Sequence, residues 1–220
     1  MISVVVPTLE EAGTIGACVA GARRALRGCE VIVVDAGSAD GTAEAAAGAG
    51  ATVVTERGSR SQAMNRGAAV ATGDVLLFLH ADTALPEGAD AAVAAALAGH
   101  GAGAFRIGFD HARPLTERLV NLRSRVFGIV YGDQALFCTR AAFEDAGGFR
   151  PIPIMEDCDL AARLRRRCGL AIVPLAVTTS ARRHRHAGGL RTVIRGLQIQ
   201  LLYVLRVSPE RLARRYPPVR

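Results

Sequence analysis

The chain has 220 residues, half of them hydrophobic, and a net charge of +7. That length is enough for one domain with a sizeable core. All 27 basic residues are arginine, which excludes a Schiff-base or P-loop lysine and favours forked recognition of phosphate. The charge suits nucleic acid, anionic lipid or phosphorylated small molecules. Aromatic residues are sparse and no recognition motif occurs, so we predict no nucleic-acid partner.

Five cysteines are scattered along the chain without any Cys-x-x-Cys spacing. This pattern predicts reduced thiols and neither a zinc site nor a disulfide framework. The amino terminus leads directly into an expected strand, so no signal peptide is expected. No apolar run reaches the length that spans a bilayer. We therefore predict a cytoplasmic protein, or one held peripherally at the inner face of the membrane.

Strand-like and helix-like segments alternate over the first 80 residues, which predicts an α/β domain with a mostly parallel central sheet flanked by helices. The expected strands are residues 2–6, 30–34, 51–54 and 75–79. The helices expected between them are residues 12–26, 42–48 and 61–71. The run 75–79 is solidly apolar, as is typical of a strand buried on both faces. No GxGxxG motif follows the first strand and no GxxxxGK[ST] motif occurs, so neither a dinucleotide fold nor a P-loop is predicted.

Acidic residues follow three of these strands: Glu11 the first, Asp35 the second and Asp82 the fourth. In open α/β sheets, ligands bind beyond the carboxyl ends of the strands. A carboxylate such as Asp82 can hold a divalent cation there, and the cation can hold a diphosphate. Each acid also has a structural alternative, which is capping for Glu11 and Asp82 and turn formation for Asp35.

The second half of the chain continues the alternation less regularly. We expect helices at residues 87–98, 115–130, 141–146 and from 155 onward, strands at 103–109, 135–138 and 170–173, and a basic loop at 178–186. Glu156, Asp157 and Asp159 fall in the first turn of the helix that begins near residue 155, where the helix dipole favours acids and tends to keep them ionised.

The tail from residue 190 to 207 is apolar with arginines interspersed, and its apolar residues fall mostly on one helical face. Such a helix can dock on the domain, form a homodimer or lie on a membrane surface. We therefore divide the chain into a domain over residues 1–188 and a basic amphipathic helix with its tail over residues 189–220.

Four motifs occur in order along the chain: residues 4–11 (VVVPTLEE), 33–42 (VVDAGSADGT), 80–82 (HAD), and 143–149 followed by Glu156-Asp157. In these the chain resembles the family 2 glycosyltransferases, which share the GT-A nucleotide-sugar fold. A narrower similarity is to a small bacterial subgroup described as radical-SAM or selenodomain-associated transferases. That similarity is carried by residues 58–67, 79–83, 131–134 and 155–157.

The resemblance implies an inverting transfer of a sugar from a nucleotide-diphosphate sugar to the hydroxyl of a small-molecule or lipid acceptor. It implies Asp157 as the general base, because such a transfer needs a carboxylate that deprotonates the acceptor. The residues implied to bind the nucleotide sugar are Glu11, Asp35, Arg60, Asn65, His80 and Asp82. Those implied to bind the acceptor are Asp133, Gln134 and Glu156.

Metal binding is implied at Asp82, which occupies the second position of the family's Asp-x-Asp motif, with Mg²⁺ or Mn²⁺ as the cation. His184 is the candidate that completes the metal shell. The chain departs from the family pattern at His80, which replaces the first aspartate and could bond the ribose, favour Mn²⁺ or simply pack, and at Glu10, which stands where an asparagine is usual. The altered motif also admits an alternative function, a catalytically silent nucleotide-sugar-binding protein.

Overall fold

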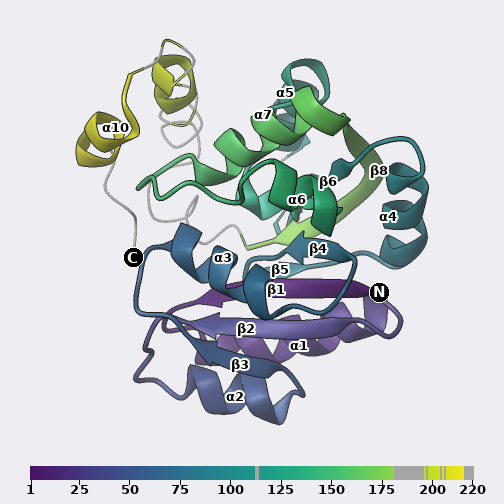
Figure 1. The fold of residues 1–220 in the computed structure, drawn as a ribbon, viewed down its shortest axis with the longest axis vertical. Coiled ribbons are helices and arrows are strands. Elements are labelled where there is room, and N and C mark those ends of the chain that lie inside the picture. The colour runs from purple at the N-terminus through teal and green to yellow at the C-terminus, as the bar shows by residue number, and fades with distance from the viewer. Residues whose placement is uncertain (112–113, 181–195, 197, 204, 206, 216–220) are drawn as a thin grey trace.

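The computed structural model describes residues 1–111, 114–180, 196, 198–203, 205 and 207–215 (Figure 1). In this part of the chain, eight strands form one mixed sheet in the order β3-β2-β1-β4-β7-β6-β8-β5. Four of the seven strand pairings are parallel, including every pairing among the first four strands of that order. The predicted α/β class, with a mostly parallel central sheet flanked by helices, is confirmed.

The strands are β1 (Ile2–Thr8), β2 (Glu30–Asp35), β3 (Thr52–Thr55), β4 (Val75–Phe78), β5 (Thr83–Ala84), β6 (Ala102–Phe109), β7 (Phe137–Thr139) and β8 (Leu170–Thr179). The helices are α1 (Ala12–Ala25), α2 (Thr42–Gly48), α3 (Arg60–Val70), α4 (Ala89–Leu97), α5 (Pro114–Phe127), α6 (Arg140–Asp145), α7 (Glu156–Cys168) and α10 (Pro209–Arg215), with a short 3-10 helix η1 (Gly132–Gln134).

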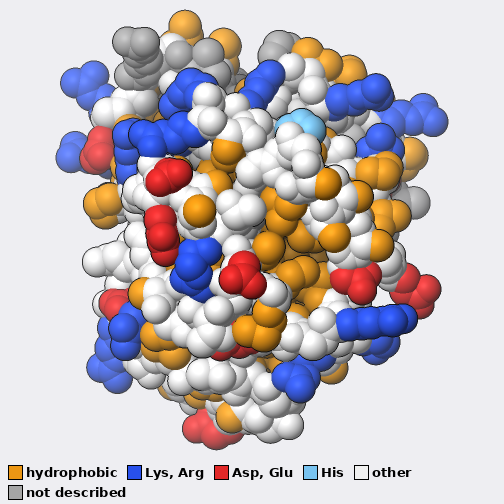
Figure 2. All heavy atoms as spheres, turned by 45° about the vertical axis from the view of Figure 1, so that its right-hand side comes forward, with side chains coloured by type: hydrophobic (Ala, Val, Ile, Leu, Met, Phe, Trp, Pro, Cys, Tyr) orange, Lys and Arg blue, Asp and Glu red, His pale blue; other side chains and the backbone are white. Residues whose placement is uncertain are grey.

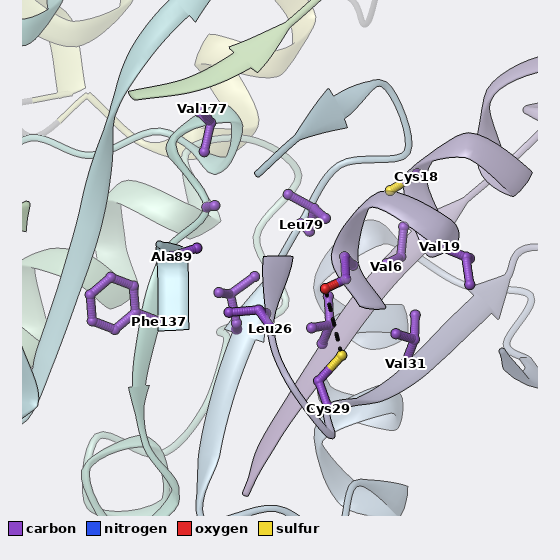
Figure 3. Close-up of a cluster of buried hydrophobic side chains, with 14 of the residues drawn as sticks. Val6, Cys18, Val19, Leu26, Cys29, Val31, Leu79, Ala89, Phe137 and Val177 are labelled. Carbon is purple, nitrogen blue, oxygen red and sulfur yellow. Dashed lines mark hydrogen bonds between the residues drawn. The ribbon is translucent and has the colours of Figure 1, made fainter. Parts of the chain in front are cut away.

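The sheet separates two hydrophobic cores, because successive side chains of a strand point to opposite faces. Val4 and Val6 of β1 belong to the core under α1 and α4, whereas Val5 belongs to the core under α3, α6 and α7. Figure 3 shows part of the first core, where the Cys29 thiol donates to the Ala22 carbonyl at 3.7 Å. Because helices cover both faces of the sheet, we expect the binding residues at the edge where the strands end.

The carboxyl end of β8 differs from the sequence prediction. The apolar run there was expected to end at residue 173, but the strand continues through Pro174 to Thr179 and takes in the first residues of the expected basic loop. Pro174 falls in a bulge, between Ile172, which pairs with Ala104, and Ala176. A bulge tolerates a proline that the regular ladder does not.

Beyond that bulge, β8 pairs with β5, a two-residue strand that the sequence did not predict. The Thr83 hydroxyl donates to the Thr179 hydroxyl at 3.0 Å and fixes this pairing. Residues 181–186 of the expected basic loop, with His184, lie outside the described residues.

Little of the tail can be compared with its prediction. Within it, residues 198–203 are helical and α10 covers Pro209–Arg215. No helix in the described part of the chain combines the length and the hydropathy needed to cross a membrane. The five cysteines are all free thiols, as predicted.

Helix α3 lies close to the sheet at Gly67, where an added Cβ would collide with Val5 and lie 3.0 Å from Val34 Cγ2. We expect Gly67→Ala to lower the free energy of unfolding by about 1–3 kcal/mol, because the core must deform to admit the methyl group. Gly21 in α1 is the matched control, since nothing lies within 4 Å of an added Cβ. There alanine should raise the stability by about 0.5–1 kcal/mol through helix propensity. Urea unfolding measures both, and equal effects would contradict the close packing of α3.

Candidate active site

The loops after β1 and β2 are bonded to each other at the carboxyl edge of the sheet. Asp35 is buried, and its Oδ2 accepts the N–H groups of Gly37 at 3.1 Å and Ser38 at 2.9 Å. Glu10 Oε1 reaches across from the first loop and accepts the Ala39 N–H at 2.8 Å. Asp35 therefore stabilises its own turn, which is the structural role that the sequence offered for it. It also lies at the edge of the sheet where the sequence predicts that the nucleotide binds.

Glu11 belongs to the same edge. Its N–H donates to the Thr42 hydroxyl at 2.9 Å and its carboxylate accepts the Thr14 hydroxyl at 2.7 Å. Burial, together with the nearby carboxylates of Asp82 and Glu11, raises the pKa of the Cys18 thiol to about 12. Since both acids act on this one thiol, Glu11 and Asp82 both lie near it.

The most concentrated group of charges surrounds Arg60, the first residue of α3. Its Nε donates to Glu156 Oε1 and its Nη2 to Asp157 Oδ2, both at 2.6 Å. Its Nη1 donates to His80 Nε2 at 3.1 Å. The start of α3, the first turn of α7 and the end of β4 therefore meet at one guanidinium.

The way in which α3 and α7 begin determines where Arg60 and the two acids are placed. A capping box between Ser59 and Gln62 starts α3, so Arg60 projects from its first turn. Met155 precedes α7 with a φ of 67°, in the left-handed region. The helix therefore begins abruptly at Glu156, and both acids fall at its positive end.

A close approach of the backbone at Gly132 completes the group. The Gly132 N–H bonds to the Asp157 carboxylate. A Cβ at this position would lie 2.5 Å from both Asp157 Oδ2 and His80 Nε2. Only glycine fits between these two side chains. The sequence indicated a polar turn here, but its contact partners lie far along the chain, so the need for glycine was missed.

The electrostatics at Asp157 correct one expectation. The residue is only 4% exposed, and burial raises the pKa of its carboxyl to about 6, against the opposing effect of the Arg60 guanidinium. The neighbouring carboxylates of Glu156 and Asp133 contribute to this rise. The helix terminus was expected to keep this acid ionised, but removal from water outweighs that effect. The carboxyl can therefore exchange a proton close to neutral pH.

His80 joins this group through the lone pair of Nε2, because a guanidinium has only donors and the ring must accept. In this arrangement the neutral ring carries its proton on Nδ1 and has no lone pair left for a cation. While Arg60 donates to Nε2, that lone pair is not available to a cation, and the roles considered for His80 from the sequence stay predictions.

Asp82 follows His80 by two residues and is half-buried. Its carbonyl accepts the Ser180 N–H at 3.2 Å. No cluster of three or more His, Cys, Asp or Glu side chains suited to a metal occurs among the described residues. One carboxylate at a ligand-binding edge nevertheless fits a cation whose other ligands are phosphate oxygens and water, the usual manner of Mg²⁺.

Two predicted binding residues have partners inside the fold. The Asn65 side chain donates to the Phe149 carbonyl at 2.8 Å and accepts the Phe149 N–H at 2.9 Å. Gln134 is 0% exposed, accepts the Ser124 hydroxyl and donates to the Phe105 carbonyl, each at 3.0 Å. The structure thus gives both a structural task. Asp133, in contrast, is near enough to Arg60 and Asp157 to raise the pKa of each.

Comparison with known proteins agrees with this architecture. A curated relative, the PGL/p-HBAD biosynthesis glycosyltransferase of Mycobacterium tuberculosis strain H37Ra, is 37% identical over 107 residues, or 45% of this chain and 42% of the relative. The Mycobacterium bovis protein of the same name matches equally. The match thus spans less than half of the length of these curated relatives.

Two crystal structures resemble the chain over most of its length. The mannosyltransferase PcManGT from Pyrobaculum calidifontis, solved with GDP-Man and Mn²⁺, has a TM-score of 0.71 at 24% identity, covering 94% of this chain and 64% of that one. Glucosyl-3-phosphoglycerate synthase from Mycobacterium tuberculosis, solved with Mn²⁺, UDP and glucosyl-3-phosphoglycerate, has a TM-score of 0.60 at 23% identity, covering 90% and 78%. These likenesses show the GT-A fold. The sequence model of glycosyl transferase family 2 matches residues 3–138, so the chain belongs to glycosyl transferase family 2.

Proposed function

We propose that this protein transfers a sugar, with inversion, from a nucleotide-diphosphate sugar to an acceptor hydroxyl, and that Asp157 is the general base. The observation that carries the proposal is a buried carboxyl with a pKa of about 6 in the first turn of α7, beside the end of β4. A base whose pKa lies near the working pH combines the correct protonation state with the ability to take a proton. Family membership and the GDP-Man bound to PcManGT support a nucleotide-sugar donor.

The chain's residues divide the reaction between two sides. On the donor side, Glu11 and Asp35 would accept hydrogen bonds from the base or ribose at the ends of β1 and β2. Asp82 would hold Mg²⁺ or Mn²⁺, which neutralises the diphosphate as it leaves. His184, four residues beyond the described Ser180, is proposed as a second ligand. On the acceptor side, Asp157 takes the hydroxyl proton while the new glycosidic bond forms on the sugar face opposite the leaving group.

Arg60 connects the two sides. It holds Asp157 and Glu156, and burial opposes its positive charge, but the two carboxylates outweigh that effect and raise the pKa of Arg60. Its side chain is still 37% exposed, so an arriving diphosphate can compete for the same donors. A forked guanidinium matches phosphate oxygens as well as carboxylates.

The acceptor site would include Asp133 and Glu156, with a small molecule or a lipid as the acceptor. The resemblance to the radical-SAM or selenodomain-associated subgroup stays a prediction from the sequence. The same holds for the division into residues 1–188 and 189–220, for the homodimer or membrane contact through the tail, and for the cytoplasmic or peripheral inner-membrane location.

A catalytically silent nucleotide-sugar-binding protein is the second candidate. It is favoured by the ion pair that occupies Asp157 and by His80 in place of the first aspartate of the metal motif. Calorimetric titration with UDP and GDP, with and without Mn²⁺, followed by a donor-hydrolysis assay separates the two. Tight binding without turnover of any nucleotide sugar selects the silent protein.

Replacement of the base is the first test of the proposal. We expect Asp157→Asn to lower the transfer rate by about 10²–10⁴-fold, the typical contribution of a general base. Nucleotide affinity should change little, because Asn keeps the shape of the side chain. Asp159→Asn is the matched control, since this acid shares the first turn of α7 and its burial but pairs with Arg163. A loss of nucleotide binding in Asp157→Asn, or an equal loss of rate in Asp159→Asn, would argue against the assignment.

The pH profile gives a second test. Because the base acts when ionised, kcat/KM should fall about tenfold per pH unit below pH 6 and level off above it. Arg60 lowers the Asp157 pKa, so Arg60→Gln should move this acidic limb to higher pH. Arg66→Gln, on the exposed face of the same helix, should leave the limb in place. A limb that does not respond to Arg60 would mean that another group controls it.

The cation site is tested through affinity. We expect Mn²⁺ to improve binding of GDP or UDP to the native chain and to give no improvement in Asp82→Ala, because the ligand that holds the cation against the diphosphate is gone. Glu87→Ala removes an exposed acid five residues further along and should keep the Mn²⁺ effect. Calorimetry measures both, and an undiminished Mn²⁺ effect in Asp82→Ala would refute the ligand assignment.

A further inference from the structure

Helix α5 turns polar side chains toward the domain and apolar side chains toward solvent. Asn121 Oδ1 accepts the Ile107 N–H at 2.9 Å and Glu117 Oε1 accepts the Phe109 N–H at 3.1 Å, so both side chains pair with the backbone of β6. The outward residues are Leu115, Leu119, Leu122 and Val126, which are 70%, 49%, 58% and 53% exposed. An ordinary surface helix has the opposite arrangement.

The charges on this outward face are of one sign. Arg118 and Arg125 are exposed on α5, at helical spacing from the apolar residues. The one acid of the helix sequence, Glu117, faces β6. Figure 2 shows arginine side chains at many places on the face in view, its upper part among them.

A basic cavity adjoins the apolar stripe. It has a volume of about 300 Å³, and its lining includes Arg106 of β6, Arg125 of α5 and Arg165 of α7. The residues that line it include no carboxylate. Three arginines that line one cavity bring positive charge and forked N–H donors of the kind that bind a phosphate group. Arg125 lines this cavity and follows Leu122 of the stripe by three residues on the same helix, so the cavity lies at the flank of the stripe.

We propose that this surface, made of the α5 stripe and the three-arginine cavity, docks on an anionic membrane. The leucines would enter the boundary between headgroups and acyl chains, and the arginines would bind lipid phosphates. Charge complementarity favours this occupant over a second copy of the chain, since a symmetric dimer through α5 would bring the arginines of both copies together. The inference does not depend on glycosyl transfer, and it assigns membrane contact to α5 and not to the tail.

The test is sedimentation of the full chain with vesicles of phosphatidylcholine alone and of phosphatidylcholine mixed with phosphatidylglycerol. The native protein should bind the anionic vesicles, and raised salt should weaken that binding. No binding, or equal binding to both vesicle types, would overturn the proposal.

A matched pair of variants locates the surface. Leu115→Gln with Leu119→Gln removes two exposed leucines, spaced one helical turn apart, from α5. Leu201→Gln with Leu205→Gln does the same in the tail, where these residues are 60% and 65% exposed. The α5 variant should bind anionic vesicles about tenfold more weakly, and the tail variant should bind like the native chain. The reverse result would place membrane contact in the tail and overturn the proposal.

A second pair of variants tests the contribution of the arginines to membrane binding. Arg125→Gln should weaken binding to the anionic vesicles about fivefold, the usual effect of one basic residue near such a surface. Arg24→Gln removes an exposed arginine from the last turn of α1 and should have no effect, whereas equal losses would indicate attraction by net charge alone.

Thermal melts verify that each variant is folded, and Leu115→Ala with Leu119→Ala replaces any glutamine variant that is not. Sedimentation velocity without lipid provides the remaining control. A native dimer that the α5 substitutions convert to a monomer would identify a second copy as the occupant and overturn the proposal.

Discussion

The candidate site depends on one guanidinium that holds two adjacent buried carboxylates. Arg60 is separated from Glu156 and Asp157 by 96 and 97 residues, so the ion pairs join the start of α3 to the helix that carries the proposed base. Two buried acids side by side repel each other and lose hydration, and a shared cation offsets part of that cost. The balance between burial and this cation brings the Asp157 pKa close to neutrality.

The elements of the first half could be predicted from the sequence because their signals are local. Solid apolar runs, separated by small and acidic residues, predicted β1 to β4 to within two residues, and the alanine-rich run predicted the bounds of α2, residues 42–48. The motif order gave the family and the fold. The continuation of β8 past Pro174 was not predicted because a proline ends most regular strands. Strand β5 was missed because two residues are too few to show a strand pattern.

The site was only partly predictable, for a different reason. The sequence shows the type of a polar side chain and its position in a motif. It does not show the hydrogen-bond partner of that side chain, because the partner depends on how the elements pack. Asn65 pairs with the backbone of Phe149, 84 residues away, and Gln134 with that of Phe105, 29 residues away, which no spacing rule reveals. Helix α5 illustrates the same limit, since its pattern indicates an amphipathic helix but not which face meets the domain.

The hydrogen bond from the Ser180 N–H to the Asp82 carbonyl has a consequence for the residues that follow. Ser180 is the last described residue before that segment, and this bond holds its backbone against that of Asp82. This hydrogen bond thus fixes the point at which the following segment begins. The arginine-rich sequence that follows therefore starts from a point beside Asp82, the proposed cation ligand.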